Sequence, residues 1–301
     1  MNPPISVIIL TFNEEQNIDN CLRSIADFVE DIYIVDSYST DKTLEIAKKY
    51  TDKIHQHKFE NHASQLNWSL TNLPIKTKWV MKLDADERLT PELKQELTNK
   101  LSGYKDDITG LYIKYKLLFL GKWIKYGNYY PTWLLRIWRN GKGYFEERFK
   151  DEHLILKEGM PEFLNNDFIH ENKKSLHSWT EKHNLYTMCE SIELLNFKYG
   201  FLKHDLVKAD FFGSQEKKKK WFKENIYSRS PLFFRAFIYF FYRYFFKLGF
   251  LDGKEGLIWH FLQGLWNMFL VDAKIYEVEK RAKLENKEIK QVVSELYNIK
   301  I

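Results

Sequence analysis

The sequence predicts an α/β fold, Rossmann-like, with a mostly parallel central sheet flanked by helices and a helical C-terminal extension. The apolar, β-branched run at 5–10 is typical of a parallel strand covered on both faces. Strand-like and helix-like segments then alternate through the first fifty residues, as in sheets with right-handed crossovers. Polar clusters follow the first strands, and ligands bind at such strand ends in open sheets. We therefore expect a binding site along one edge of the sheet.

The elements before position 101 follow from their periodicity and their end signals. Thr90 is a typical helix N-cap, and Pro91 suits the first helical position, so a helix is expected over 91–101. The other expected elements here are strands at 5–10 and 31–36, a strand that ends in Asp84 and Asp86, and helices at 18–25, 44–50 and within 58–70.

The remaining elements are less regular, and the composition changes near position 201. We expect a strand at 108–120, a short strand that ends at 168–170 and a helix at 175–196, and an apolar run stands at 154–156. We place a catalytic domain at 1–200 and a helical extension at 201–301. The extension carries 19 Lys and Arg against 12 acids, while the first 200 residues carry 27 against 29.

A basic and aromatic extension suits an anionic membrane surface better than a nucleic acid. The segment 232–251 is aromatic, and its cations at 235, 243 and 247 fall on one helical stripe with Tyr239. Three cations make spanning a bilayer expensive, so an interfacial helix is predicted. With 257–271 it forms a plausible hairpin, and membrane contact is expected through 215–271. The alternative is that this hairpin packs on the catalytic domain.

The two cysteines give no disulfide framework, and no signal-length apolar run opens the chain. We therefore expect a peripheral protein on the cytoplasmic face of the inner membrane.

An acidic stretch at the end of the third strand, Lys78 to Arg88, is the strongest candidate for chemistry. In extended chain Asp84 and Asp86 would project from the same side and could bind one hard divalent cation, with Glu87 directly after them. A surface turn is the alternative. The stretches at 11–15 and 36–41 also stand at strand ends, so three polar loops converge on one edge.

Other polar residues have two readings each. Gln65 and Asn67 could face the site or form an ordinary polar helix face. Arg136 could contact phosphate or serve as an ion-pair partner, and His170 at a strand end could bind a cation or phosphate or be structural. The acids at 151 and 152 could supply a general base or belong to a charged hairpin rim.

These motifs together resemble the family 2 glycosyltransferases of the GT-A fold, and in particular bacterial lipopolysaccharide inner-core β-glucosyltransferases. The resemblance covers roughly 5–190. The similar stretches are SVIILTFNEE at 6–15, VDSYSTD at 35–41, QLN at 65–67, WVMKLDADE at 79–87, LRIWR at 135–139, DEHL at 151–154 and 170–186. Tyr38 is a departure, because many similar sequences have glycine there.

The resemblance implies roles for single residues. The residues that would bind the sugar-nucleotide donor are Thr11, Phe12, Glu14, Asp36, Gln65, Asn67, Asp84 and Arg136. Among them, Asp36 would accept a hydrogen bond from uracil. Asp86 would bind a divalent cation, Mg²⁺ or Mn²⁺, with Asp84 and His170 as further candidate ligands. Glu152 is the expected general base, and Asp151 is the reserve.

The implied reaction is an inverting, metal-dependent transfer of a hexose from a UDP-sugar, UDP-glucose first, to a hydroxyl group. The acceptor would be a lipid-linked saccharide, a lipopolysaccharide core or another surface polysaccharide. Two alternatives stay open: transfer to polyprenyl phosphate, which needs no base, and a non-catalytic nucleotide-binding module at the membrane surface.

Overall fold

The computed structural model describes residues 2–146, 153–201 and 230–299. The chain divides into two compact units, Met1–Lys174 and Ser175–Ile301, which are described separately here. This division lies before the boundary expected at 200. The reason is that the helix at Leu176–Tyr199 packs against C-terminal helices and shares their core.

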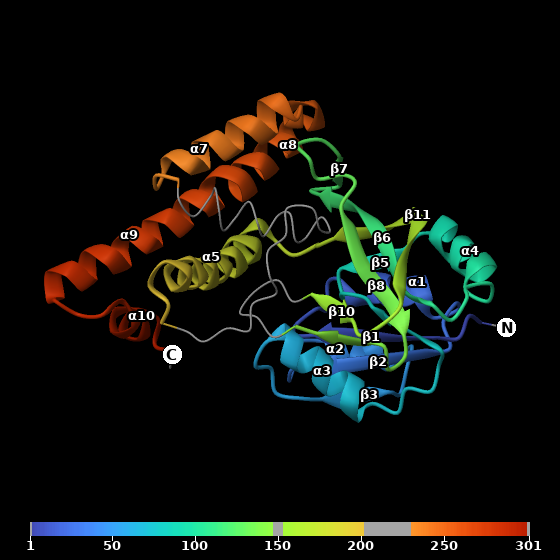
Figure 1. Cartoon of the computed structure of the whole chain (residues 1–301). Helices are drawn as coiled ribbons and strands as arrows, with labels where there is room; N and C mark the ends of the chain where they lie inside the picture. Colours follow the sequence, from blue (N-terminus) through green and yellow to red (C-terminus); the bar gives the residue numbers. More distant parts are fainter. Residues whose placement is uncertain (1, 147–152, 202–229, 300–301) are drawn as a thin grey trace. The chain divides into compact units, whose positions relative to one another are not determined.

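The first unit is built on a mixed sheet of nine strands (Figure 1). Its strands run in the order β3-β2-β1-β4-β8-β6-β11-β5, with β7 paired to β6. The first four strands of this order are mutually parallel, β8 is antiparallel to both neighbours, and β6 and β11 are parallel. The expected α/β fold class, a central sheet flanked by helices with a helical C-terminal extension, is confirmed.

The strands of the sheet are β1 (Ile5–Thr11), β2 (Asp31–Asp36), β3 (Ile54–Gln56), β4 (Trp79–Lys82), β5 (Glu87–Leu89), β6 (Ile108–Phe119), β7 (Lys122–Ile124), β8 (Trp133–Arg139) and β11 (Met160–Glu171). A separate two-stranded ribbon consists of β9 (Gly143–Phe145) and β10 (Leu154–Leu156). The helices of this unit are α1 (Ile18–Ile25), α2 (Thr43–Ala47), α3 (His62–Asn72) and α4 (Pro91–Lys100).

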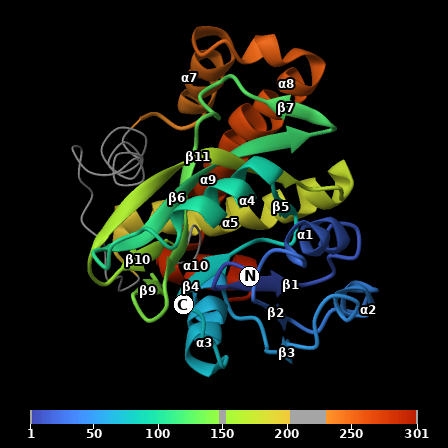
Figure 2. The ribbon, with the colours of Figure 1, turned by 90° about the vertical axis from the view of Figure 1, so that its right-hand side faces the viewer.

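Two hydrophobic cores cover the two faces of the sheet because side chains alternate along each strand. Val7 and Ile9 point into the core that α1 and α4 complete. Ile8, between them, points into the core that includes Leu66 of α3 and Trp138 of β8. The β9–β10 ribbon lies against α3 on this second side (Figure 2). Such two-sided burial explains the near-continuous apolar run of β1.

The turn between β4 and β5 is held from three sides. Thr90 caps α4 by accepting a hydrogen bond from Leu93 N (3.2 Å), and the same hydroxyl donates to Asp167 O on β11 (2.7 Å). On the other side Glu171 N donates to Asp86 O (2.8 Å). The acidic stretch is therefore fixed between rigid elements, as the N-cap signal at Thr90 predicted.

The second unit is helical. It contains α5 (Leu176–Tyr199), α7 (Phe234–Phe241), α8 (Gly253–Trp259), α9 (Asn267–Glu285) and α10 (Ile289–Tyr297), with π-helical turns at Tyr242–Phe246 and His260–Trp266. Helices α5, α9 and α10 share a core that includes Leu195, Val271 and Val292. The part of 215–271 from 215 to 229 lies outside the described residues. Within the described ranges, every helix is too short or too polar to cross a bilayer.

The expected helical hairpin is confirmed: α7 and the π-helical turn after it run antiparallel to the continuous helix formed by α8 and the start of α9 (Figure 1). Residues 249–252 form a single 3₁₀ turn between the two arms.

Candidate active site

The carboxyl ends of β1 and β2 meet in a buried pair of side chains. Thr11 and Asp36 are opposite each other in the parallel register, and Thr11 Oγ1 donates to Asp36 Oδ1 (2.9 Å). The backbone N–H of Ser39 donates to Asp36 Oδ2 (2.8 Å), and its hydroxyl donates to Oδ1 (2.5 Å). Asp36 is fully buried, so these donors compensate its desolvation. They also fix the direction of its carboxylate.

The loops after β1 and β2 are joined by hydrogen bonds. Asn13 N donates to Ser39 Oγ (2.9 Å), and Glu14 N donates to Thr43 Oγ1 (2.7 Å). The Glu14 carboxylate accepts hydrogen bonds from Asn17 (2.7 Å) and Lys174 (2.6 Å). The Phe12 side chain takes no part in these hydrogen bonds and is 56% exposed at the edge of the sheet. An exposed ring beside fixed polar groups is suited to stacking on a base.

Tyr38 has a positive φ of 62° and an exposed side chain. This left-handed backbone is the conformation that favours glycine. Tyr38 adopts it and adds a ring at the edge of the site.

Gln65 and Asn67 on α3 are both engaged within the protein. Gln65 is fully buried, with Oε1 2.6 Å from His57 Nδ1 and Nε2 donating to His57 O (3.1 Å). Asn67 donates to Phe145 O (2.8 Å) and accepts from Phe145 N (2.9 Å). Asn67 therefore fixes the β9–β10 ribbon on α3, and Gln65 fixes the loop after β3.

The acidic stretch is a turn, which corrects one expectation. Strand alternation was expected to place Asp84 and Asp86 on the same side, but β4 ends at Lys82 and β5 begins at Glu87. Glu87 N donates to Asp84 O, and Asp84 N donates to Glu87 Oε2 (2.9 Å each). The two aspartates therefore have different partners. The surface-turn alternative was correct about the backbone.

Asp84 and Glu87 form a charged cluster with Arg136 of β8. Arg136 Nη2 lies 3.0 Å from Asp84 Oδ2 and 2.5 Å from Glu87 Oε1, and Lys82 Nζ lies 3.5 Å from Asp84 Oδ1. Burial opposes ionisation of Asp84, yet Lys82 and Arg136 hold its pKa well below the usual range. Burial raises the pKa of Glu87 despite Arg136. Of its two readings, Arg136 therefore fills the role of ion-pair partner.

Asp86 lies beside His170 of β11. Asp86 Oδ2 is 3.7 Å from His170 Nε2 and accepts a hydrogen bond from Asn172 Nδ2 (3.1 Å). The antiparallel register pairs His170 with Glu87, whose Oε1 is 3.6 Å from His170 Nδ1. Burial would lower the pKa of His170, but Asp86 and Glu87 outweigh it and raise the pKa to about 9.

The pair formed by Asp86 and His170 is suited to a divalent cation. Among the described residues, no three His, Cys, Asp or Glu side chains gather closely enough to hold a metal ion by themselves. Mg²⁺ sites commonly use one or two protein ligands and complete their shell with phosphate oxygens and water. The 3.7 Å separation of the Asp86 and His170 ligand atoms is short enough for both to bind one ion. Cation binding there must displace the proton that His170 holds.

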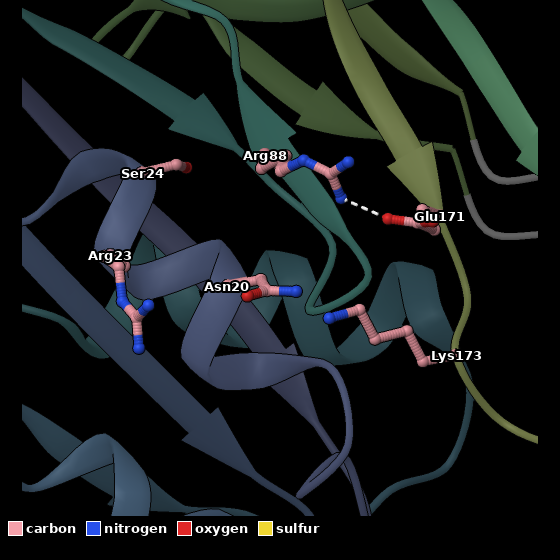
Figure 3. Close-up of a pocket in the computed structure, with 6 residues that line it drawn as sticks. All are labelled: Asn20, Arg23, Ser24, Arg88, Glu171 and Lys173. Carbon is pink, nitrogen blue, oxygen red and sulfur yellow. Dashed lines mark hydrogen bonds and ion pairs between the residues drawn. The ribbon is translucent and has the colours of Figure 1, made fainter. Parts of the chain in front are cut away.

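A hollow of about 390 Å³ opens beside this turn (Figure 3). It is lined by Asn20, Arg23, Ser24, Arg88, Glu171 and Lys173. Figure 3 shows Lys173 extending toward Asn20 and Arg88 pairing with Glu171 (2.6 Å). Arg23 is paired with Asp19 on α1. Because both arginines are neutralised, we assign no anion site to the hollow.

The structure thus brings most of the predicted residues to one edge of the sheet. Thr11, Phe12, Glu14 and Asp36 stand at β1 and β2, while Asp84, Asp86, Arg136 and His170 gather around the acidic turn. The predicted bases Asp151 and Glu152 lie outside the described residues. Two partners of the aspartates in the acidic turn were missed by sequence reasoning: Lys82 and Asn172. Both stand two positions from a candidate residue, Asp84 and His170 respectively, and this spacing in extended chain could have indicated them.

The fold and the site define a class of protein: an open α/β sheet with a network of polar side chains and an acidic turn at the carboxyl ends of its parallel strands. The chain belongs to glycosyl transferase family 2, whose family model matches residues 6–160.

Curated relatives match shorter parts of the chain. The lipopolysaccharide core biosynthesis glycosyltransferase LpsC of Rhizobium meliloti is 30% identical over 161 residues, which are 52% of this chain and 58% of that protein. An uncharacterised glycosyltransferase of Rickettsia bellii is 30% identical over 116 residues, 38% of each chain. The chain therefore spans only about half the length of the curated relatives it matches.

Solved structures are similar at lower identity. TarS of S. aureus (residues 1–349) has a TM-score of 0.45 and 18% identity, with 92% of each chain covered. Glucosyl-3-phosphoglycerate synthase from Mycobacterium tuberculosis, crystallised with Mn²⁺ and UDP-glucose, has a TM-score of 0.32 and 22% identity over 38% of this chain and 43% of that one.

Proposed function

We propose that this protein is an inverting glycosyltransferase that moves a hexose from a UDP-sugar, UDP-glucose first, to a hydroxyl group of an envelope glycolipid or polysaccharide. Membership of glycosyl transferase family 2 supports the reaction class. The observation that carries the assignment is the arrangement of three strand ends on one edge: Thr11 with Asp36, and the turn that holds Asp86 beside His170.

The donor would bind along β1, β2 and the acidic turn. Asp36 is held by Thr11 and Ser39 with its carboxylate fixed, as a group that reads a base by hydrogen bonding must be. The exposed Phe12 ring offers a stacking surface for the base. Glu14, held by Asn17 and Lys174, keeps the loop beside Phe12 in place.

Asp86 and His170 would hold the divalent cation together with the diphosphate of the donor. When bound, this cation neutralises the negative charge that grows on the leaving nucleoside diphosphate. Asn172 orients the Asp86 carboxylate by its hydrogen bond, and Arg136 balances the charges of Asp84 and Glu87 beneath it. These contacts keep five ionisable side chains in one place before any ligand arrives.

Glu152 would take the proton from the acceptor hydroxyl as that oxygen attacks the anomeric carbon, with Asp151 as the reserve base. The described residues on either side of 147–152 are joined to each other and to α3. Glu146 N donates to His153 O (3.0 Å), and Asn67 fixes the neighbouring Phe145 on α3. A positioned base contributes about 10²- to 10⁴-fold to a rate.

The acceptor and location are part of the same proposal. LpsC, the relative from Rhizobium meliloti, is named for lipopolysaccharide core biosynthesis, which supports a lipopolysaccharide core or another lipid-linked saccharide as acceptor. We place the enzyme peripherally on the cytoplasmic face of the inner membrane, where nucleotide sugars and lipid-linked acceptors meet.

A panel of nucleotide sugars tests the proposal. We expect UDP-sugars to raise the thermal unfolding midpoint of the protein in the presence of Mn²⁺ and not in its absence, because ligands stabilise the state that binds them. The stabilising sugar nucleotide is then offered with membrane glycolipid extracts, and UDP release and glycolipid mass are measured. Metal-dependent UDP binding without transfer to any extract, or preference for another nucleotide, would contradict the assignment.

A further inference from the structure

The helical hairpin of residues 232–271 encloses a buried ion pair where its arms meet the following turn of α9. Arg235 and Asp272 have side chains that are 4% and 0% exposed. Arg235 Nε donates to Asp272 Oδ1 (2.8 Å), and Phe233 N donates to Asp272 Oδ2 (2.7 Å). The first cation of the predicted stripe, Arg235, therefore faces the start of the helix that follows the hairpin.

Other polar residues of the hairpin also lie inside it. Asp252, His260 and Asn267 are each no more than 2% exposed. The arms approach closely at Gly249, where an added Cβ would lie 2.4 Å from Nε2 of His260. Arg243 lies against the ring of Tyr239 and donates to its hydroxyl (2.5 Å). The interior of the hairpin is thus rich in polar groups and closely packed.

The outer surface of the same hairpin is apolar. Large hydrophobic side chains are exposed along both arms and gather around the turn that joins them. Those nearest the turn are Phe241, Phe245, Phe246, Leu248, Phe250 and Leu251. Phe246 is 80% exposed, more than any other large hydrophobic side chain among the described residues. A hairpin folded for water would have the reverse arrangement, since exposed aromatic surface costs free energy there.

We propose that residues 232–271 form a monotopic membrane anchor whose turn enters the hydrocarbon of one leaflet. Buried polar groups and outward apolar groups suit a lipid environment, because hydrocarbon is a good solvent for apolar side chains and a poor one for polar groups. The segment 234–246 is about 20 Å long as a helix, shorter than the roughly 30 Å hydrocarbon core, so the hairpin enters without crossing.

Charge favours lipid over a second copy of the chain as the occupant of this surface. Lys247 and Lys254 are exposed on either side of the turn, where they can reach phosphate headgroups by snorkelling. The acids within 232–271 are Asp252, which is buried, and Glu255. Two copies facing each other through this surface would bring like charges together, whereas an anionic leaflet complements them.

The anchor deepens the membrane location given under the proposed function, and it rests on that location. It does not depend on the proposed reaction. Vesicle binding needs no donor, acceptor or metal, and sugar transfer can be measured on a detergent-solubilised acceptor. The anchor can therefore fail while the proposed reaction succeeds, and the reverse also holds.

Flotation of the full chain with vesicles of phosphatidylethanolamine and phosphatidylglycerol tests the anchor. We expect binding that persists in about 1 M NaCl, where electrostatic attraction is screened within about 3 Å. Phe246→Asp should reduce the partition coefficient by at least about tenfold. The matched control is Leu284→Asp on α9, which removes a 75% exposed side chain outside the hairpin and should change binding by less than about twofold.

The depth of the turn in the bilayer is measured with a fluorophore attached to Phe246→Cys or, as a control, to Leu284→Cys. Both variants also carry Cys189→Ala, which removes a partly accessible free cysteine. Lipids brominated in the acyl chain should quench the label at position 246 and leave the label at 284 unchanged. Three results would overturn the anchor: loss of binding in high salt, equal quenching at the two positions, or a dimer in solution that Phe246→Asp dissociates.

Discussion

Arg136 and Glu87 form an ion pair beneath the acidic turn, with Nη2 and Oε1 2.5 Å apart and side chains 9% and 0% exposed. Arg136 comes from β8 and Glu87 from the first position of β5, so the pair joins two segments about fifty residues apart. It also brings positive charge to Asp84.

Arg136→Ala should lower the free energy of unfolding by about 3–5 kcal/mol, because it leaves the buried Glu87 without its counter-charge. Chemical denaturation measures this change. Arg23→Ala is the control: its ion pair with Asp19 is exposed, and its loss should cost no more than about 1 kcal/mol. Equal effects of the two substitutions would show that the Arg136 pair contributes little to folding.

Asp86→Ala should abolish the stabilisation by UDP and Mn²⁺ and reduce transfer by roughly 100-fold or more, because the cation supplies several kcal/mol of charge stabilisation. Asp84→Asn should have a smaller effect on the metal dependence, since Asp84 is paired with Arg136 and Lys82. Asp106→Asn, whose side chain is 96% exposed, is the inert control. Full activity of Asp86→Ala would remove Asp86 from the metal site.

Glu152→Gln should reduce transfer to a hydroxyl acceptor by about 10²- to 10⁴-fold while leaving UDP-sugar binding unchanged, because a base acts on the acceptor and not on the donor. Titration calorimetry and initial rates separate the two effects. Asp151→Asn tested in parallel distinguishes the two candidate bases. If both variants transfer at the normal rate, the acceptor is already anionic, as polyprenyl phosphate would be.

Asn67→Ala should destabilise the protein by about 1–3 kcal/mol, since the N–H and C=O of Phe145 lose their partners. It should also lower kcat, because it releases the ribbon that leads into 147–152. The matched control is Asn72→Ala on the exposed face of α3, where one hydrogen bond to Trp68 O is lost. A lower stability with unchanged kcat would restrict Asn67 to a role in folding.

His260 should make the protein less stable in acid. Burial and the charge of Arg243 lower the pKa of His260 to about 4, against an ordinary value near 6.5. Above pH 6.5 the imidazole is neutral in both states, so His260 causes no pH dependence there. As the pH falls from 6.5 to 4, the unfolded chain binds a proton that the folded chain does not bind. The loss amounts to roughly 3 kcal/mol at the lower limit.

Urea unfolding at pH 7.5 and pH 5 measures this loss, and His260→Gln should remove the part of the pH dependence that His260 causes. Identical slopes for the two proteins would contradict the assignment. Arg243→Gln should raise the pKa of His260 and reduce the loss.

Local signals were enough to predict most elements. The helix at Ile18–Ile25 and the strand at Asp31–Asp36 have the predicted bounds, because apolar periodicity and end signals act within a few residues. The edge of the sheet on which Thr11, Asp36 and the acidic stretch meet was also predictable. Parallel strands point their carboxyl ends the same way, so consecutive strand ends share an edge.

The sequence by itself therefore determined the fold class, the family and the side of the sheet that carries the candidate site. Only the tertiary structure decided which groups meet there: Arg136 reaches the acidic turn because β8 is antiparallel to β4, and Asn172 reaches Asp86 because β11 lies beside β5. It also decided that Arg235 faces Asp272 within the hairpin. These contacts depend on pairing between segments distant in sequence, which local periodicity does not encode. A helical stripe defines a face, and only the packed partner determines what that face meets.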